Sequence, residues 1–164
     1  MPLVPFESLP DDSRVWVFAA DPPLQDAGAE QLLDNVERLL STWNAHGSPL
    51  RTGYDWSESR FLTIAVDQST AGASGCSIDG LYRTLRALEP ALGASLLSGG
   101  RIFYREPSGA VAAVSRETFG DIAAAGVVGR ETRVFDTTIT ALGDWRARFE
   151  RPLAESWHAQ LIPA

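Results

Sequence analysis

The stretch SRVWVFAAD, residues 13–21, predicts the first strand of the fold. Val15 and Val17 would face one side of this strand, and Trp16 and Phe18 the other. Because both faces are apolar, the pattern predicts a central strand that is covered on both sides.

The residues after this strand have the apolar spacing of a helix. Apolar residues recur every three or four positions, at Leu32, Leu33, Val36, Leu39, Leu40 and Trp43. This spacing predicts an amphipathic helix over 24–45, and His46, Gly47 and Pro49 form a stop signal for it. Residues 50–56 and 60–66 then predict two strands of a hairpin.

The second half of the chain repeats this mixture of helices and strands. A second apolar stripe runs through Ile78, Leu81, Tyr82, Leu85, Leu88 and Leu92. Strands are expected at 100–106, 109–115 and 132–140, and helices at 115–126 and 142–150. Ser115 is the expected N-cap of the first of these helices, and Gly126 its C-cap.

The order of these elements predicts an α+β fold with an antiparallel or mixed sheet. The first part fits a split β-α-β arrangement of the ferredoxin-like type, and the second part would extend the same sheet or pack beside it. The segments show no linker or repeat, so we expect residues 1–164 to form a single domain.

Composition excludes several classes of protein. The chain has 164 residues, a net charge of −7 and 14 basic residues, all of them arginine. An acidic chain without a basic run is a poor candidate for nucleic-acid binding. We expect no membrane insertion and no secretory signal, and a single cysteine fits a cytoplasmic location.

The stretch AGASGCSIDG, residues 71–80, contains that cysteine, Cys76. It precedes the second helical pattern, and the positive end of a helix favours a thiolate. Ser74 and Ser77 would cap the helix or donate to an anion, and Asp79 falls in the first turn. In the alternative reading, Cys76 only fills a small apolar gap in a turn, which is the more frequent role of a lone cysteine.

A cysteine nucleophile usually needs a base, and the chain has two histidines, His46 and His158. His46 would oppose the dipole at a helix C-terminus. His158 lies near the chain end, where Trp157 would anchor it, and we expect this segment to lie near residues 71–80. Trp157 is also a candidate ligand-binding residue. Asp67 ends a strand beside that loop, where it would face a ligand or cap the turn.

The sequence lacks the motifs of two other kinds of site, a metal site and a phosphate-binding loop. The histidines and Cys76 do not form a close ligand pair, so no metal site is predicted. A phosphate-binding loop requires a lysine that this chain does not contain, and no cofactor is expected.

Six motifs, ESLPDDSRVWVF, WNAHG, RFLTIAVD, SGCSID, VFDTT and ESWH, occur in this order from about residue 6 to residue 158. In these the chain resembles an uncharacterised family of short bacterial proteins, some of them labelled "ABC transporter ATPase". Residues 74–79, His46 and residues 157–158 all fall within motifs of this family, so the resemblance implies that they lie close together in space. It implies no established activity. The ATPase label is not supported here, because the lysine of a Walker A motif is absent.

Two functions follow as hypotheses. The first is a module that binds a small molecule or a protein in a pocket at residues 71–80. The second is a cysteine-dependent enzyme, in which Cys76 is the nucleophile and His158 or His46 the base.

Overall fold

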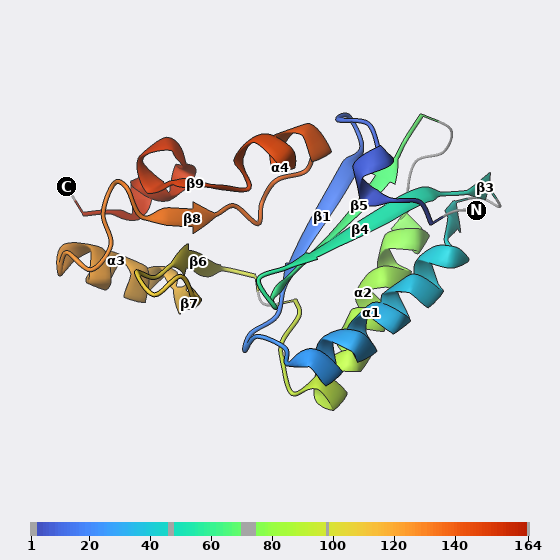
Figure 1. Cartoon of the computed structure of the whole chain (residues 1–164), viewed down its shortest axis with the longest axis horizontal. Helices are drawn as coiled ribbons and strands as arrows, with labels where there is room; N and C mark the ends of the chain where they lie inside the picture. The colour runs from blue at the N-terminus through green and yellow to red at the C-terminus, as the bar shows by residue number, and fades with distance from the viewer. Residues whose placement is uncertain (1–2, 46–47, 70–74, 98, 164) are drawn as a thin grey trace. The chain divides into compact units, whose positions relative to one another are not determined.

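The structure is a computed structural model of the chain, and it describes residues 3–45, 48–69, 75–97 and 99–163. Within these ranges it confirms an α+β fold with four α-helices and two antiparallel sheets of three and four strands, besides a short two-stranded pair (Figure 1). Contacts divide the chain into two compact units. Unit 1 comprises 1–98 and 138–146, and unit 2 comprises 99–137 and 147–164. The expectation of a single domain stays a prediction.

Unit 1 is built on a three-stranded sheet with the order β1 (Arg14–Ala19), β5 (Phe61–Asp67), β4 (Arg51–Ser57). β5 pairs antiparallel with both neighbours, so β1 and β4 run in the same direction with β5 between them. The helix α1 (Asp26–Ser41) connects β1 to β4. This is the split β-α-β arrangement that the sequence predicts.

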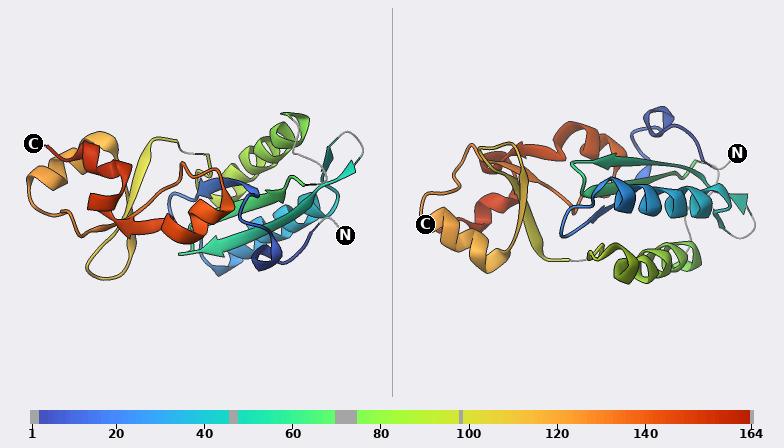
Figure 2. Two further views of the ribbon diagram at one scale, coloured as in Figure 1. Left: turned by 90° about the horizontal axis from the view of Figure 1, so that it is seen from above. Right: turned by 60° about the horizontal axis from the view of Figure 1, so that its bottom comes forward.

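One face of this sheet packs against α1 and against α2 (Gly75–Leu92), as Figure 2 also shows. Phe18, Leu62 and Ile64 project from the strands into this core, where they meet Val36 of α1 and Leu85 of α2. Each large apolar side chain buried in this way contributes roughly 1.5–3 kcal/mol. The periodic apolar positions therefore hold both helices to the sheet.

The other face of the sheet is covered by η1 (Phe6–Ser8) and by residues of α4 (Leu142–Arg148). The rings of Phe6 and Trp145 meet edge to face, with centroids 5.1 Å apart. Gly53 of β4 lies directly beneath the first of these segments. A Cβ on it would lie 2.9 Å from the carbonyl oxygen of Val4.

The prediction that residues 13–21 form the central strand is wrong, because β1 lies at one end of the order and β5 is central. Both faces of β1 are apolar because each packs against its own layer. Among the described residues, the free edge of β1 forms isolated bridges alone, from Arg14 to Ala141 and from Ala19 to Leu97.

The helix predicted over 24–45 ends earlier, at Ser41. Asn44–Ala45 instead forms β2, which pairs with β3 (Ser48–Pro49). Trp43 continues the apolar stripe, but it follows the helix, which ends at Ser41. His46, expected to oppose the dipole at the helix C-terminus, lies outside the described residues.

Unit 2 contains the second sheet, which is separate from the first. Its order is β7 (Val111–Ser115), β6 (Arg101–Arg105), β8 (Arg133–Phe135), β9 (Glu150–Pro152). Its core combines strand residues with Phe119 of α3 (Arg116–Ala124) and Leu153 of η2 (Leu153–Glu155). The strand expected over 132–140 is only three residues long, and the helix expected over 142–150 ends at Arg148.

The N-cap of α3 agrees with the prediction, whereas the C-cap is Ala125 and the predicted Gly126 is the next residue. The side chain of Ser115 accepts a hydrogen bond from the backbone N–H of Thr118 at 3.0 Å, and Gly126 has φ +78° just after the helix. The last helical element, η3 (Trp157–Leu161), packs against α3. In the part of the chain that is described, no helix is both long and apolar enough to cross a membrane.

Candidate functional site

The sequence points to the start of α2, and the structure connects this region to the segment before His46. α2 begins at Gly75, so the backbone of Cys76 lies in its first turn, as predicted. The next residue, Ser77, is 6% exposed. Its hydroxyl donates a hydrogen bond of 2.6 Å to the backbone carbonyl of Asn44.

A second hydrogen bond joins the same two segments. The indole N–H of Trp43 donates to the backbone carbonyl of Ser77 at 3.0 Å in a buried position. Two hydrogen bonds in opposite directions thus fix residues 43–44 against the first turn of α2. The hydroxyl hydrogen of Ser77 thus holds the two segments together, and the expectation that Ser77 caps the helix or binds an anion stays a prediction.

Asp67 ends β5 and is 5% exposed. Its carboxylate accepts hydrogen bonds from the backbone N–H of Ser69 at 2.9 Å and from Nη1 of Arg51 at 3.0 Å. The bonds from Ser69 and then the bond and charge of Arg51 hold the pKa of Asp67 below its usual value, against the effect of burial. Asp67 is therefore an ionised group that joins two strands and begins a turn.

Arg51 was not among the residues singled out in the sequence. It is directly opposite Asp67 in the register of the β4–β5 hairpin. The observed register is fixed by the three residues between Ser57 and Phe61. The predicted hairpin, with strands over 50–56 and 60–66, instead places Ala65 opposite Arg51, so it could not have found this ion pair.

Asp79 lies on a different side of α2 from Ser77, because its side chain is exposed. It borders a shallow hollow with Tyr82, Arg83 and Arg86. The structure thus separates Asp79 from Ser77. His46 and Ser74 are outside the described residues, and so are the other residues of 71–74 in the predicted pocket. The side chain of Cys76 is not described either.

His158 and Trp157 belong to unit 2, where they form an ordered cluster. Nδ1 of His158 lies 2.6 Å from Oγ of Ser156, and its ring stacks on Trp157 at 4.0 Å between centroids. The indole N–H of Trp157 donates to Asp136 at 3.2 Å, and the guanidinium of Arg116 lies over the indole ring at 5.3 Å. The expected anchoring role of Trp157 fits these contacts.

Burial is the main cause of a lowered pKa at His158, about 4 instead of 6.5. Arg116 and Arg151 lower it further, and Asp136 opposes them. The imidazole is therefore neutral at pH 7 and a weak base. The predicted proximity of this segment to residues 71–80 stays a prediction.

Metal ligands do not gather in the described ranges. No group of three or more His, Cys, Asp or Glu side chains is placed there to hold an ion. The start of α2 thus offers a helix N-terminus that two hydrogen bonds hold against residues 43–44.

Comparisons with known proteins found no matching family model, no matching curated protein and no matching solved structure.

Proposed function

We propose that the protein is a binding module for a small molecule or a protein, and that its site lies at the start of α2. The observation that carries this proposal is the pair of hydrogen bonds between Ser77 and residues 43–44. They hold the chain just before His46 against the turn that contains Cys76. The family resemblance, itself a proposal, groups the same two segments.

The polar groups around this site favour binding over catalysis. Asp67 is committed to Arg51 and Ser69, and the hydroxyl of Ser77 is committed to Asn44. Such groups keep a framework rigid, and rigid frameworks reduce the entropy lost on binding. A general base instead needs a free acceptor within reach of the proton that it removes.

The alternative is a cysteine-dependent enzyme with Cys76 as nucleophile. The same two hydrogen bonds favour His46 over His158 as its base, because they join the neighbours of His46 and Cys76 in the chain. His158 is a weaker candidate, since it is 1% exposed and its pKa is about 4.

The alkylation rate of Cys76 against pH tests both functions, and the single cysteine makes the signal unambiguous. The binding module predicts that iodoacetamide reacts with the folded protein and reports an ordinary thiol pKa, near about 8.5. His46→Asn should leave this value unchanged, as should the control His158→Asn.

Two other outcomes decide against that proposal. A thiol pKa below 7 that rises in His46→Asn but not in His158→Asn would establish the enzyme instead. A thiol that reacts only in urea would overturn both functions, because Cys76 would then be a buried packing residue.

A further inference from the structure

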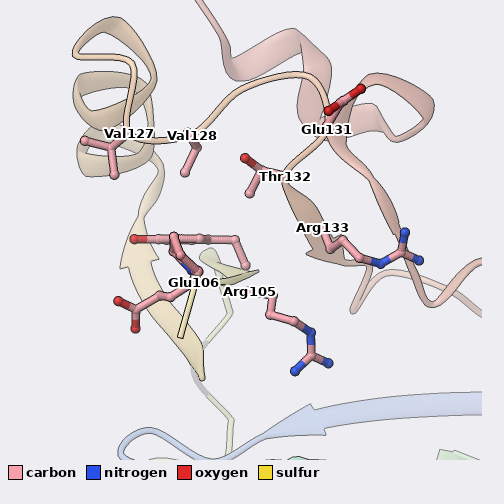
Figure 3. A pocket seen from close by; sticks show the side chains of 9 residues that line it. Arg105, Glu106, Val127, Val128, Glu131, Thr132 and Arg133 are labelled. Atoms are coloured by element: carbon pink, nitrogen blue, oxygen red, sulfur yellow. The ribbon is translucent and has the colours of Figure 1, made fainter. Parts of the chain in front are cut away.

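Unit 2 has a hollow of about 360 Å³ at the ends of two neighbouring strands (Figure 3). It lies where β6 ends, at Tyr104 and the following residues, and where β8 begins, at Thr132 and Arg133. Val127 and Val128, which follow α3, form another wall. The hollow is independent of the site proposed at α2, which belongs to unit 1.

Hydrogen bonds from backbone N–H groups, one to a carbonyl and one to a side-chain hydroxyl, fix the wall formed by residues 125–132. After α3, the N–H of Val127 donates to the carbonyl of Ile122 at 2.9 Å, in the manner of a Schellman motif with Gly126 at positive φ. Further on, the N–H of Gly129 donates to Oγ1 of Thr132 at 2.9 Å. This wall is therefore formed before any partner arrives.

The inner surface of the hollow is largely apolar. Tyr104 and Val128 are buried in the core of unit 2 and also line the hollow. Val127 at the rim is 62% exposed. An exposed valine is ordinary when it stands alone, but this one borders a concave apolar surface, where a partner's apolar side chain would cover it.

The arginines of the lining are already paired. Arg105 binds Glu150 through Nε at 2.8 Å and Nη2 at 3.1 Å, and Arg133 binds the same carboxylate at 3.3 Å. Figure 3 shows both guanidinium groups turned away from Val127 and Val128. The two guanidinium groups share the one negative charge of Glu150, so Glu106, Glu131 and Glu150 together leave a net charge of −1 around the hollow.

The carboxylates of the lining are different. Glu106 and Glu131 are exposed, and neither side chain forms an ion pair or hydrogen bond with another described residue. Figure 3 shows them on opposite sides of the hollow. The hollow therefore combines an apolar interior with two negative charges at its edge, in a chain whose net charge is −7.

We propose that this hollow binds a segment of a partner protein that presents one apolar side chain between basic residues. The apolar side chain enters the hollow and covers Val127, and the flanking lysine or arginine residues pair with Glu106 and Glu131. Charge complementarity selects basic over acidic segments.

The test uses the full-length protein labelled with ¹⁵N and three short peptides. The probe is acetyl-Arg-Leu-Arg-Gly-amide, and the controls are the same peptide with Glu for Arg and with Gly for Leu. We expect the probe alone to cause saturable shifts of amide signals in residues 104–107 and 127–133. The affinity should fall as salt rises.

Variants locate the contacts. Val127→Thr keeps the shape of an exposed side chain and should weaken binding of the probe about fourfold. Glu106→Gln and Glu131→Gln should each weaken it roughly two- to fivefold. Glu117→Gln is the matched control, since Glu117 is an exposed carboxylate of α3 that does not line the hollow, and it should have no effect.

Equal binding of the acidic peptide, or of the peptide without leucine, would overturn the proposal. So would shifts confined to other residues, or full affinity in both Val127→Thr and Glu131→Gln. A negative result with the peptides does not affect the proposal for the site at α2. The alkylation of Cys76 tests unit 1, whereas the peptides test the hollow in unit 2.

Discussion

Oγ of Ser156 and Nδ1 of His158 lie 2.6 Å apart, and His158 is 1% exposed. With Trp157 stacked on the imidazole and bonded to Asp136, this pair fixes η3 in unit 2. A buried imidazole in such a cluster couples the packing of the C-terminal segment to pH.

The sign of this coupling follows from the lowered pKa. His158 has a pKa of about 4 when folded and 6.5 when exposed. Between these values the unfolded chain binds the proton more tightly than the folded chain. The contribution of His158 to the free energy of unfolding is therefore fully present above pH 6.5 and decreases toward pH 4. We expect a loss of about 2 kcal/mol at pH 5 relative to pH 7.5, measured by urea unfolding.

His158→Gln should remove most of the change in the free energy of unfolding between pH 7.5 and pH 5. This result is expected whatever effect the substitution has on stability at pH 7.5. The carboxylates Asp67 and Glu150 have lowered pKa values and so lose their contribution at more acidic pH. An unchanged slope in His158→Gln would show that another group is responsible.

Two glycines of unit 1 should respond in opposite ways to alanine. In Gly53→Ala the new Cβ would lie 2.9 Å from the carbonyl oxygen of Val4 and 3.0 Å from Cα of Phe6. Both are backbone atoms, so we expect a loss of about 1–3 kcal/mol. Gly80 lies in α2 with no atom within 4 Å of a new Cβ, and Gly80→Ala should gain roughly 0.5–1 kcal/mol. Urea unfolding compares them, and equal effects would contradict the placement of η1 on β4.

The long helices and the β4–β5 hairpin could be predicted because their apolar spacing is local and uninterrupted. Ser115 was also predictable, since a cap depends on three neighbouring residues. β8 and β9 have only three residues each. Their pairing depends on contacts between distant residues, such as Arg105 with Glu150, which local periodicity does not contain.

The site at α2 was predictable in part. The position of Cys76 in a first helical turn follows from the glycines before it and the apolar stripe after it. The bond between Ser77 and Asn44 was not predictable, because Trp43 continues the stripe of α1 and suggested a helix through residue 45. The chain leaves the helix after Ser41 instead, and the indole N–H of Trp43 then binds the carbonyl of Ser77.

Glu150 should contribute more than an ordinary surface ion pair. It binds Arg105 and Arg133, which are like charges on the paired strands β6 and β8. These bonds, with that from Arg105 the largest, hold the pKa of Glu150 below its usual value. Glu150→Gln leaves the two arginines without a common carboxylate, and we expect a loss of roughly 1–2 kcal/mol that shrinks in 1 M NaCl.

Asp11→Asn is the control for that variant. Asp11 pairs with Arg146 at 2.6 Å, but its side chain is 77% exposed, so its removal should have a much smaller effect. If both variants lose the same stability, the shared carboxylate has no special role.

Residues 1–98 should not form a stable fragment, because unit 1 is completed by residues 138–146. The N–H of Val15 donates to the carbonyl of Thr140 at 2.9 Å, and the N–H of Leu142 donates to the carbonyl of Ser13 at 2.9 Å. Leu142 is buried, so a fragment without it exposes one face of the sheet. We expect the 1–98 fragment to lack a cooperative urea transition by circular dichroism. In the full chain, Leu142→Ala should cost about 2–5 kcal/mol. A cooperatively folded 1–98 fragment, together with a small effect of Leu142→Ala, would show that the first 98 residues form a domain by themselves.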